Sequence, residues 1–193
     1  MPPVPPVPPP QPSDPGARRS LRTLLASGPA GRAIAKFDVR TYRAIRSAAR
    51  PPALVEGVSR FSSLGEHAGI WLVLGATGAT VDPRRRERWV RALGGVFGAY
   101  CANTLLKLVF RRKRPLLEDL PALIKTPTAL SFPSAHASSS FAAARAYSGL
   151  LPAVPLYTAA SAMAFSRVYL GVHYPTDILV GMGIGTVAGS LAR

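Results

Sequence analysis

Long apolar runs separated by arginine-rich segments are the feature that most constrains how this chain can fold. The runs cover residues 68–81, 92–110, 137–165 and 178–192. A membrane-spanning helix needs about 20 predominantly apolar residues, and Pro152 and Pro155 divide the third run into two segments. The pattern therefore predicts an all-α, multi-pass transmembrane helical bundle. The expected spans are five, at about 64–81, 92–110, 137–151, 153–169 and 176–192.

Charge and cysteine content exclude several other classes. The 193 residues carry a net charge of +15, are 48% hydrophobic and have a mean hydropathy of +0.17. The basic residues lie in blocks beside the apolar runs, as they do around membrane segments, rather than over a soluble core as in a nucleic-acid-binding domain. The lone Cys101 excludes an intramolecular disulfide framework and a cysteine-based zinc site.

Two N-terminal segments differ in composition from the rest of the chain. Nine of the first fifteen residues are proline, so 1–17 is predicted to be a disordered, proline-rich tail. Residues 18–60 are strongly basic, and apolar side chains recur at near-helical spacing within 34–49. This pattern predicts an amphipathic helical region on an anionic membrane surface, or a helix packed on the protein. The expected membrane-embedded domain is then 61–193.

The last apolar run carries a stripe of small residues. Gly181, Gly185 and Gly189 follow one another at four-residue spacing, which lets helix backbones approach closely in lipid. The stripe is expected either to pack inside the bundle or to form a homodimer face. Arg145 lies within a predicted span, where a charge must face a polar interior or reach the interface.

Three polar clusters lie at predicted helix ends. The first is Lys107, six residues, then Arg114-Pro115. The second is Ser131-Phe132-Pro133-Ser134-Ala135-His136, and the third is Ser166-Arg167, five residues, His173, three residues, Asp177. Two spans separate the loop that holds the first two clusters from the loop that holds the third. All three clusters are therefore expected to meet at one site on one membrane face.

The residue types in these clusters indicate metal-free phosphoryl transfer. Lys107, Arg114 and Arg167 suit an anion with several oxygens, and arginine binds phosphate in bidentate fashion. Asp177 in the first helical turn after Pro175 could orient His173 as a nucleophile. His136 could act as acid for the leaving group and base for water. We therefore expect a phosphohistidine intermediate and no metal or other cofactor.

The three clusters together resemble the signature of the type 2 phosphatidic-acid phosphatase superfamily, in order and in spacing. The resemblance extends over about 60–192. It implies a helical membrane bundle related to vanadium haloperoxidases, with His173, Asp177 and His136 as catalytic residues. It also implies a phosphate site formed by Lys107, Arg114, Ser134, the backbone at Ala135, and Arg167. Ala135 stands where the superfamily usually has glycine; we expect activity to survive, because the backbone N–H is retained.

Other charged residues near the clusters have two interpretations each. Glu66 and His67 are either interfacial polar residues or line the pocket mouth and contact a substrate head group. The run Arg111-Arg112-Lys113 is either a solvated face or binds lipid phosphate. With five spans, the N-terminal segment and the site share one side of the cell membrane. The positive-inside rule predicts that this side is cytoplasmic, although five arginines in 84–91 oppose it.

The substrate is expected to be a lipid-linked phosphate. Small size and an Arg-, Gly- and Ala-rich composition are similar to a compact branch of the superfamily, assigned to hydrolysis of decaprenylphosphoryl-5-phosphoribose in cell-wall arabinan precursor synthesis. One alternative is a phosphatidate, phosphatidylglycerol-phosphate or polyprenyl-diphosphate phosphatase. Another is an inactive membrane scaffold, which the complete set of motif residues argues against. A vanadate-dependent peroxidase is expected to be larger and soluble.

Overall fold

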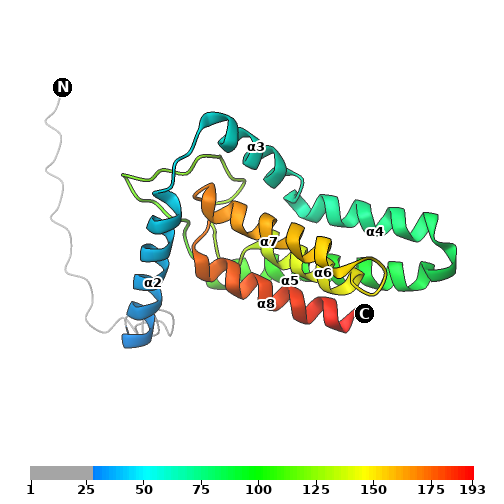
Figure 1. The fold of residues 1–193 in the computed structure, drawn as a ribbon. Helices are drawn as coiled ribbons and strands as arrows, with labels where there is room; N and C mark the ends of the chain where they lie inside the picture. Colours follow the sequence, from blue (N-terminus) through cyan, green and yellow to red (C-terminus); the bar gives the residue numbers. More distant parts are fainter. Residues whose placement is uncertain (1–27) are drawn as a thin grey trace, which may run out of the picture. The chain divides into compact units, whose positions relative to one another are not determined.

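The computed structural model describes residues 28–193, and within this range it contains seven α-helices and no strand (Figure 1). Residues 36–193 form one compact unit, the second of the two into which the chain divides. Helix α2 (Pro29–Arg46) begins before this unit and runs into it. The predicted proline-rich tail 1–17 and the basic residues 18–27 lie outside the described range. The expectation of an all-α protein is confirmed for the rest.

The basic N-terminal segment forms two helices, α2 and α3 (Pro52–Ser63), where the helical spacing within 34–49 predicted one. The prolines at 51 and 52 separate them, since proline favours the first turn of a helix and not its interior. In α2, Asp38, Tyr42 and Arg46 recur every four residues and are buried on one side. This side packs on the rest of the second unit.

Contacts from Tyr42 and Arg46 fix α2 to two loops. The Tyr42 hydroxyl donates to the carbonyls of Leu120 and Gly171, both at 3.3 Å. The Arg46 guanidinium donates to the carbonyls of Tyr169 (3.0 Å) and Pro121. The 169–171 segment lies within the third cluster, between Arg167 and His173, so α2 is part of the frame around that cluster.

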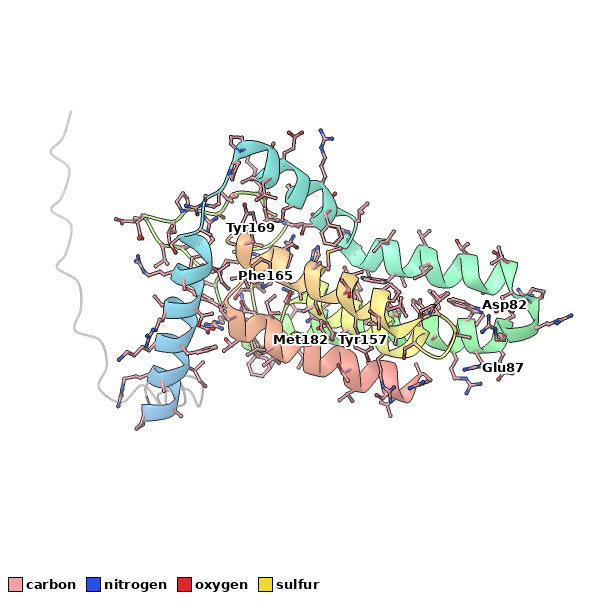
Figure 2. The ribbon with its side chains drawn as sticks, viewed as in Figure 1. Asp82, Glu87, Tyr157, Phe165, Tyr169 and Met182 are labelled. Atoms are coloured by element: carbon pink, nitrogen blue, oxygen red, sulfur yellow. The ribbon has the colours of Figure 1, made fainter. Side chains whose placement is uncertain are left out.

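Helices α4 (Gly69–Val81) and α5 (Arg86–Phe110) form an antiparallel pair joined by a short turn, η2 (Pro83–Arg85). The Asp82 carboxylate closes the turn by accepting from Arg85 Nε at 2.6 Å and Trp89 Nε1 at 3.2 Å. Figure 2 shows Asp82 and Glu87 together at this end of the pair. The turn thus holds the arginine-rich segment 84–91 at the end of α5 remote from Lys107.

Helix α6 (Ala135–Tyr147) is the centre of the bundle and nearly all of its side chains are buried. It contacts α5, α7 (Ala153–Tyr169) and α8 (Pro175–Leu191) extensively. Its sequence is mainly alanine and serine, which let neighbouring helices approach closely. Buried serines complete their hydrogen bonds within the bundle, for example with Trp71 Nε1 donating to Ser140 Oγ at 2.8 Å.

The glycine stripe of α8 faces α6 of the same chain. A Cβ atom added at Gly185 would lie 2.2 Å from the Ser138 carbonyl oxygen, and one at Gly181 would lie 2.7 Å from the Ser134 carbonyl oxygen. Gly189 is equally close to Ala142. The alternative of a homodimer through Gly181, Gly185 and Gly189 is therefore wrong, because α6 already occupies that face. Next to the stripe, Arg145 Nε donates to Ser190 Oγ at 2.9 Å, which gives this cation a partner.

The helices match the predicted spans in order: α4 and α6 are shorter than predicted, α5 is longer, and α7 and α8 have the predicted length. Among the described residues one stretch, Pro83–Phe110, is long and apolar enough to cross a membrane by length and composition. The first predicted span, 64–81, is broken by η1 (Glu66–Ala68), where His67 and Ala68 have φ of 52° and 61°. The third becomes a 13-residue helix of about 20 Å.

Candidate active site

The three polar clusters meet at one end of the bundle, as the topology of the spans predicts. They enclose a cavity of about 170 Å³ between the C-terminal end of α5, the N-terminal end of α6, and the segment joining α7 to α8. Its lining combines the expected cations and histidines with residues from η1, α5 and the 127–128 loop. The lining residues are Glu66, His67, Tyr100, Thr104, Lys107, Arg114, Pro127, Thr128, Ala135, His136, Arg167 and His173.

His173 and Asp177 form a buried pair. Pro175 begins α8 and places Asp177 in its first turn, where the carboxylate accepts from the Tyr174 backbone N–H at 2.9 Å. Asp177 Oδ2 lies 3.4 Å from His173 Nδ1, and both side chains are at most 2% exposed. Nδ1 has no closer hydrogen-bond partner. In unliganded sites such contacts are often long and tighten when substrate binds.

The other imidazole nitrogen of His173 faces a cation. Arg114 Nη1 lies 3.1 Å from His173 Nε2 and also donates to the Val172 carbonyl at 2.7 Å. A guanidinium has no acceptor, so Nε2 must present its lone pair and the ring proton must sit on Nδ1, toward Asp177. Burial, followed by the positive charges of Arg114, Lys107 and Arg167, holds the pKa of His173 well below its usual value. The ring is therefore neutral at neutral pH.

His136 reaches the same cavity from the first turn of α6. Its Nε2 lies 3.2 Å from the Ser62 carbonyl oxygen, which can only accept, so Nε2 carries a proton. Nδ1 is then the nitrogen left to exchange a proton with a bound molecule. Ser62 also accepts at its hydroxyl from Arg167 Nη1 at 2.5 Å. One residue of α3 thus orients both a histidine and a cation of the site.

The side chains of Lys107 and Arg167 have incomplete hydrogen bonding. Lys107 Nζ is 3.4 Å from the carbonyl oxygens of Leu130 and Ser131, which is long for an ammonium donor. Arg167 is 3% exposed, and its buried Nε has no hydrogen-bond partner. Buried donors without partners are costly, and both side chains line the cavity. An anion with several oxygens would satisfy them.

The N-terminus of α6 supplies backbone donors to the cavity. Ser134 is the N-cap, and its hydroxyl accepts from the Ala137 N–H at 3.4 Å. The N–H groups of Ala135 and His136 lie in the first turn, where the helix offers them no carbonyl partner. Ala135 has no positive φ, so its backbone does not require the glycine that the superfamily usually has. Ser134 is fully buried and does not line the cavity, in contrast to the expectation that its side chain binds phosphate.

The cavity mouth contains residues that sequence reasoning left open or missed. Glu66 and His67 are exposed and line the cavity, as one of their two interpretations requires. The His67 ring packs on Tyr100, with centroids 6.2 Å apart. Tyr100 and Thr104 were missed because they lie in an apolar run without a motif around them. Thr104 lies three residues and Tyr100 seven residues before Lys107, so all three lie on the same side of α5.

Arg112 corrects the interpretation of 111–113 as a solvated face. Its side chain is 29% exposed and bridges two buried carboxylates, Asp177 at 2.8 Å and Asp38 at 2.6 Å. Burial opposes the charge of Arg112, but the two carboxylates outweigh it and raise its pKa further. Arg111 and Lys113 are exposed as expected. In the described range, no three histidine, cysteine or acidic side chains are grouped so that they could hold a metal ion.

Comparison with known proteins decides the family. The model of the PAP2 superfamily matches residues 88–193, the part of the chain that contains all three clusters. The chain belongs to the PAP2 superfamily. The resemblance drawn from the motifs is thereby confirmed, and this PAP2 protein is a phosphatase that hydrolyses phosphoric monoesters.

Curated relatives and solved structures agree with this assignment. The PAP2 chain is 42% identical over 147 residues to decaprenylphosphoryl-5-phosphoribose phosphatase of Mycobacterium tuberculosis, covering 72% of this chain and 79% of the relative. It is 42% identical over 132 residues to the enzyme of that name from Mycolicibacterium smegmatis, covering 67% and 72%. Aquifex aeolicus LpxE superposes with a TM-score of 0.68 at 28% identity, covering 80% of this chain and 93% of that one.

A transmembrane PAP2-type phosphatidylglycerolphosphate phosphatase from Bacillus subtilis shares the fold. Its TM-score is 0.71 at 24% identity, and the match covers 89% of this chain and 90% of that chain. The fold is therefore that of a PAP2-type phosphatase.

Proposed function

We propose that this protein removes the 5-phosphate from decaprenylphosphoryl-5-phosphoribose, or a closely similar polyprenyl-linked ribose phosphate, in the synthesis of cell-wall arabinan precursors. The observation that carries the proposal is the 42% identity to phosphatases of that name over most of both chains. A cavity lined by three cations and three histidines is suited to the phosphate of such a lipid.

The proposed reaction begins with His173 as nucleophile. Its Nε2 lone pair attacks phosphorus, and the bond to the ribose oxygen breaks. With the anionic phosphate bound, His136 carries a proton on Nδ1 as well as on Nε2, and it donates the Nδ1 proton to that oxygen. The product is a phosphohistidine, with the positive imidazolium held by Asp177. His136, now without that proton, accepts one from water, which attacks phosphorus and releases inorganic phosphate and neutral His173.

The phosphate oxygens are held by the cations and by backbone donors. Arg114 already contacts Nε2, so it would move its Nη1 donor onto an incoming phosphate oxygen while staying beside the nucleophile. Lys107 and the unpartnered Nε of Arg167 approach from other sides of the cavity. The N–H groups of Ala135 and His136 at the α6 N-terminus favour an anion. Ser134 supports these groups as the N-cap rather than as a direct ligand.

Head-group recognition is assigned to the cavity mouth. Glu66 offers carboxylate oxygens and His67 offers ring nitrogens that could hydrogen-bond to ribose hydroxyls. The left-handed backbone at His67 and Ala68 turns the chain sharply at this point. Tyr100 supports the His67 ring from α5. These groups are not part of the three motifs, so they can differ among phosphatases that share the phosphate site.

The proposed membrane arrangement keeps five crossings, with shorter spans supplemented by neighbouring residues. Large apolar side chains on α4, α5 and α8 are exposed, which in a membrane protein is the surface that faces lipid. Examples are Val73, Phe97, Leu105, Leu108 and Val187, each more than half exposed. Residues 61–193 would form the embedded domain of a cell-membrane protein. Residues 18–60 would lie along an anionic, cytoplasmic surface, with the proline-rich tail 1–17 beyond them and the active site facing the cytoplasm.

A substrate comparison tests the proposal. Detergent-purified protein is given a polyprenylphosphoryl-ribose 5-phosphate, a phosphatidate and a polyprenyl diphosphate, and released phosphate is measured with His173→Ala as blank. A clear preference in kcat/KM for the ribose lipid is expected. Preference for phosphatidate or the diphosphate would keep the phosphatase chemistry and overturn the substrate. Release from none of the three would favour an inactive scaffold.

A further inference from the structure

A buried ionic network connects the nucleophile's partner to the N-terminal helix. Arg112 donates from Nη1 to Asp177 Oδ1 at 2.8 Å and from Nη2 to Asp38 Oδ2 at 2.6 Å. The Asp38 side chain is 1% exposed, and that of Asp177 is fully buried. The Arg112 guanidinium also lies over the Tyr174 ring, 4.3 Å from its centroid. The network therefore has a single geometry fixed by two carboxylates and an aromatic face.

Asp38 also binds the start of α8 directly. It accepts from the Thr176 backbone N–H at 2.9 Å and from the Thr176 hydroxyl at 2.6 Å. Thr176 is in the first helical turn, where the backbone N–H has no partner within its own helix, so Asp38 caps α8 from another helix. The Thr176 hydroxyl in turn accepts from Arg112 at 2.8 Å. Asp38, on α2, thus binds both the backbone and the side chain of Thr176, the residue that precedes Asp177.

Each carboxylate oxygen of Asp177 consequently has a fixed donor. Oδ1 accepts from Arg112, and Oδ2 accepts from the Tyr174 N–H while facing His173 Nδ1. An oriented carboxylate fixes the tautomer and direction of the imidazole that it contacts. The direction of the His173 lone pair therefore depends on a chain of contacts that ends at Asp38.

Asp38 also sets the charge balance around the nucleophile. The charged and titratable groups that face His173 or Asp177 are Lys107, Arg112, Arg114, His136, Arg167 and Tyr174. All except the Tyr174 phenol are cationic or basic, and Asp177 is one carboxylate among them. With Asp38 present, the charge of Arg112 is shared between two acids. Without it, Arg112 would bind Asp177 alone and leave less negative charge to stabilise a positive His173.

We propose that Asp38 and Arg112 are positioning residues for the His173–Asp177 pair, so that the N-terminal helix α2 is a working part of the catalytic site. This inference rests on the proposed phosphohistidine reaction. It gives the basic N-terminal segment a role beyond contact with the membrane surface. Neither residue touches the phosphate; both act through Asp177.

The test compares two acidic residues that both attach α2. Asp119 forms an exposed ion pair with Arg43 of α2, with side chains 55% and 49% exposed. Asp38→Asn and Asp119→Asn therefore each remove one carboxylate from α2 contacts, but only the first alters the network at Asp177. Both full-length variants are assayed for kcat, KM and the pH dependence of kcat/KM with a farnesylphosphoryl-ribose 5-phosphate.

We expect Asp38→Asn to lower kcat by about 10- to 100-fold, as a small misorientation of a reacting group can, with KM changed less than about threefold. The acidic limb of its kcat/KM profile should move to lower pH, because uncompensated positive charge disfavours protonated His173. Asp119→Asn should keep the wild-type kcat and the wild-type position of the acidic limb of the kcat/KM profile. Asp38→Glu, which retains the charge, should recover most of the activity and serves if the asparagine variant does not fold.

Wild-type kcat and an unmoved acidic limb in folded Asp38→Asn would overturn the inference. So would equal losses in Asp38→Asn and Asp119→Asn, or an Asp38→Glu variant as inactive as the asparagine variant. Failure of the proposed function is distinguishable, because the wild-type protein would then release no phosphate from the probe or would do so independently of His173.

Discussion

Arg114 Nη1 lies 3.1 Å from His173 Nε2, so a permanent cation faces the atom proposed to attack phosphorus. This contact keeps the lone pair on Nε2 and the proton on Nδ1. It also places a phosphate-binding donor beside the nucleophile before substrate arrives. The same guanidinium can then hold a phosphate oxygen at the moment the nitrogen–phosphorus bond forms, which is the geometry that stabilises a transition state.

Replacing Arg114 by lysine is expected to lower kcat/KM by about 10- to 150-fold, the loss of one charge-assisted hydrogen bond of about 1.5–3 kcal/mol. Lysine keeps the charge but cannot contact the Val172 carbonyl, Nε2 and phosphate in one planar arrangement. Steady-state phosphate release measures the effect. Arg111→Lys, at an exposed position nearby, is the matched control and should stay within twofold of wild type. Equal activity of both variants would exclude a specific role of the Arg114 guanidinium.

The pH dependence of stability reports the neutral state of His173. Burial and then the nearby cations lower its pKa well below the usual value of 6.5 in the folded protein, while the unfolded chain takes up a proton near that value. Its contribution to stability is therefore complete above about pH 6.5 and is lost as the pH falls through the folded-state pKa. Thermal unfolding in detergent between about pH 7.5 and 5 should show a steeper fall in Tm for wild type than for His173→Gln. Parallel curves would mean that His173 is not held neutral.

The contact between α6 and α8 predicts opposite behaviour at two glycines of one helix. Gly185→Ala places a methyl group against the Ser138 carbonyl, and overpacking of this kind costs about 1–3 kcal/mol, or several degrees in Tm. Gly183 has open space around its Cβ position. Gly183→Ala should therefore leave Tm unchanged or raise it slightly. A lower Tm for Gly183→Ala than for Gly185→Ala would mean that the Gly183 side of α8, and not the Gly185 side, packs against α6.

Ala135 is expected to be a neutral departure from the superfamily pattern. The residue begins α6 with an ordinary backbone conformation, and its N–H is retained. Ala135→Gly should therefore keep kcat/KM within about threefold and lower stability by no more than about 1 kcal/mol, the usual cost of glycine in a helix. Phosphate release and thermal unfolding test the two parts. A tenfold gain in activity would show instead that the alanine side chain obstructs the phosphate.

The sequence was sufficient to predict the elements that depend on local pattern. Pro175 marked the start of α8 and with it the position of Asp177 beside His173. The order of the apolar runs predicted that the clusters meet. Contacts between distant segments were not predictable: Asp38 lies 74 residues from Arg112, and neither has a distinctive local pattern. An arginine in a run of three basic residues has the same local pattern whether it is solvated or bridges two buried acids.

Two further differences between the sequence-based predictions and the structure also arise from contacts that the local sequence does not show. The glycine stripe suits any close helix contact, and only the tertiary packing of α6 showed which helix takes it. Ser134 suits either a phosphate ligand or an N-cap, since both use the same hydroxyl near the start of a helix. The structure assigns the hydroxyl to the cap, because it accepts from the Ala137 N–H and the side chain is fully buried.

Trapping of the phosphoenzyme tests the central claim most directly. Full-length protein in detergent is mixed with polyprenylphosphoryl-ribose carrying ³²P in its 5-phosphate, quenched within milliseconds in alkaline SDS, and analysed for protein-bound label. The account predicts transient label that survives alkali, is lost in acid as a phosphohistidine is, accumulates to a different level in His136→Ala, and is absent in folded His173→Ala. Turnover without protein-bound label, or label that persists in His173→Ala, would contradict it.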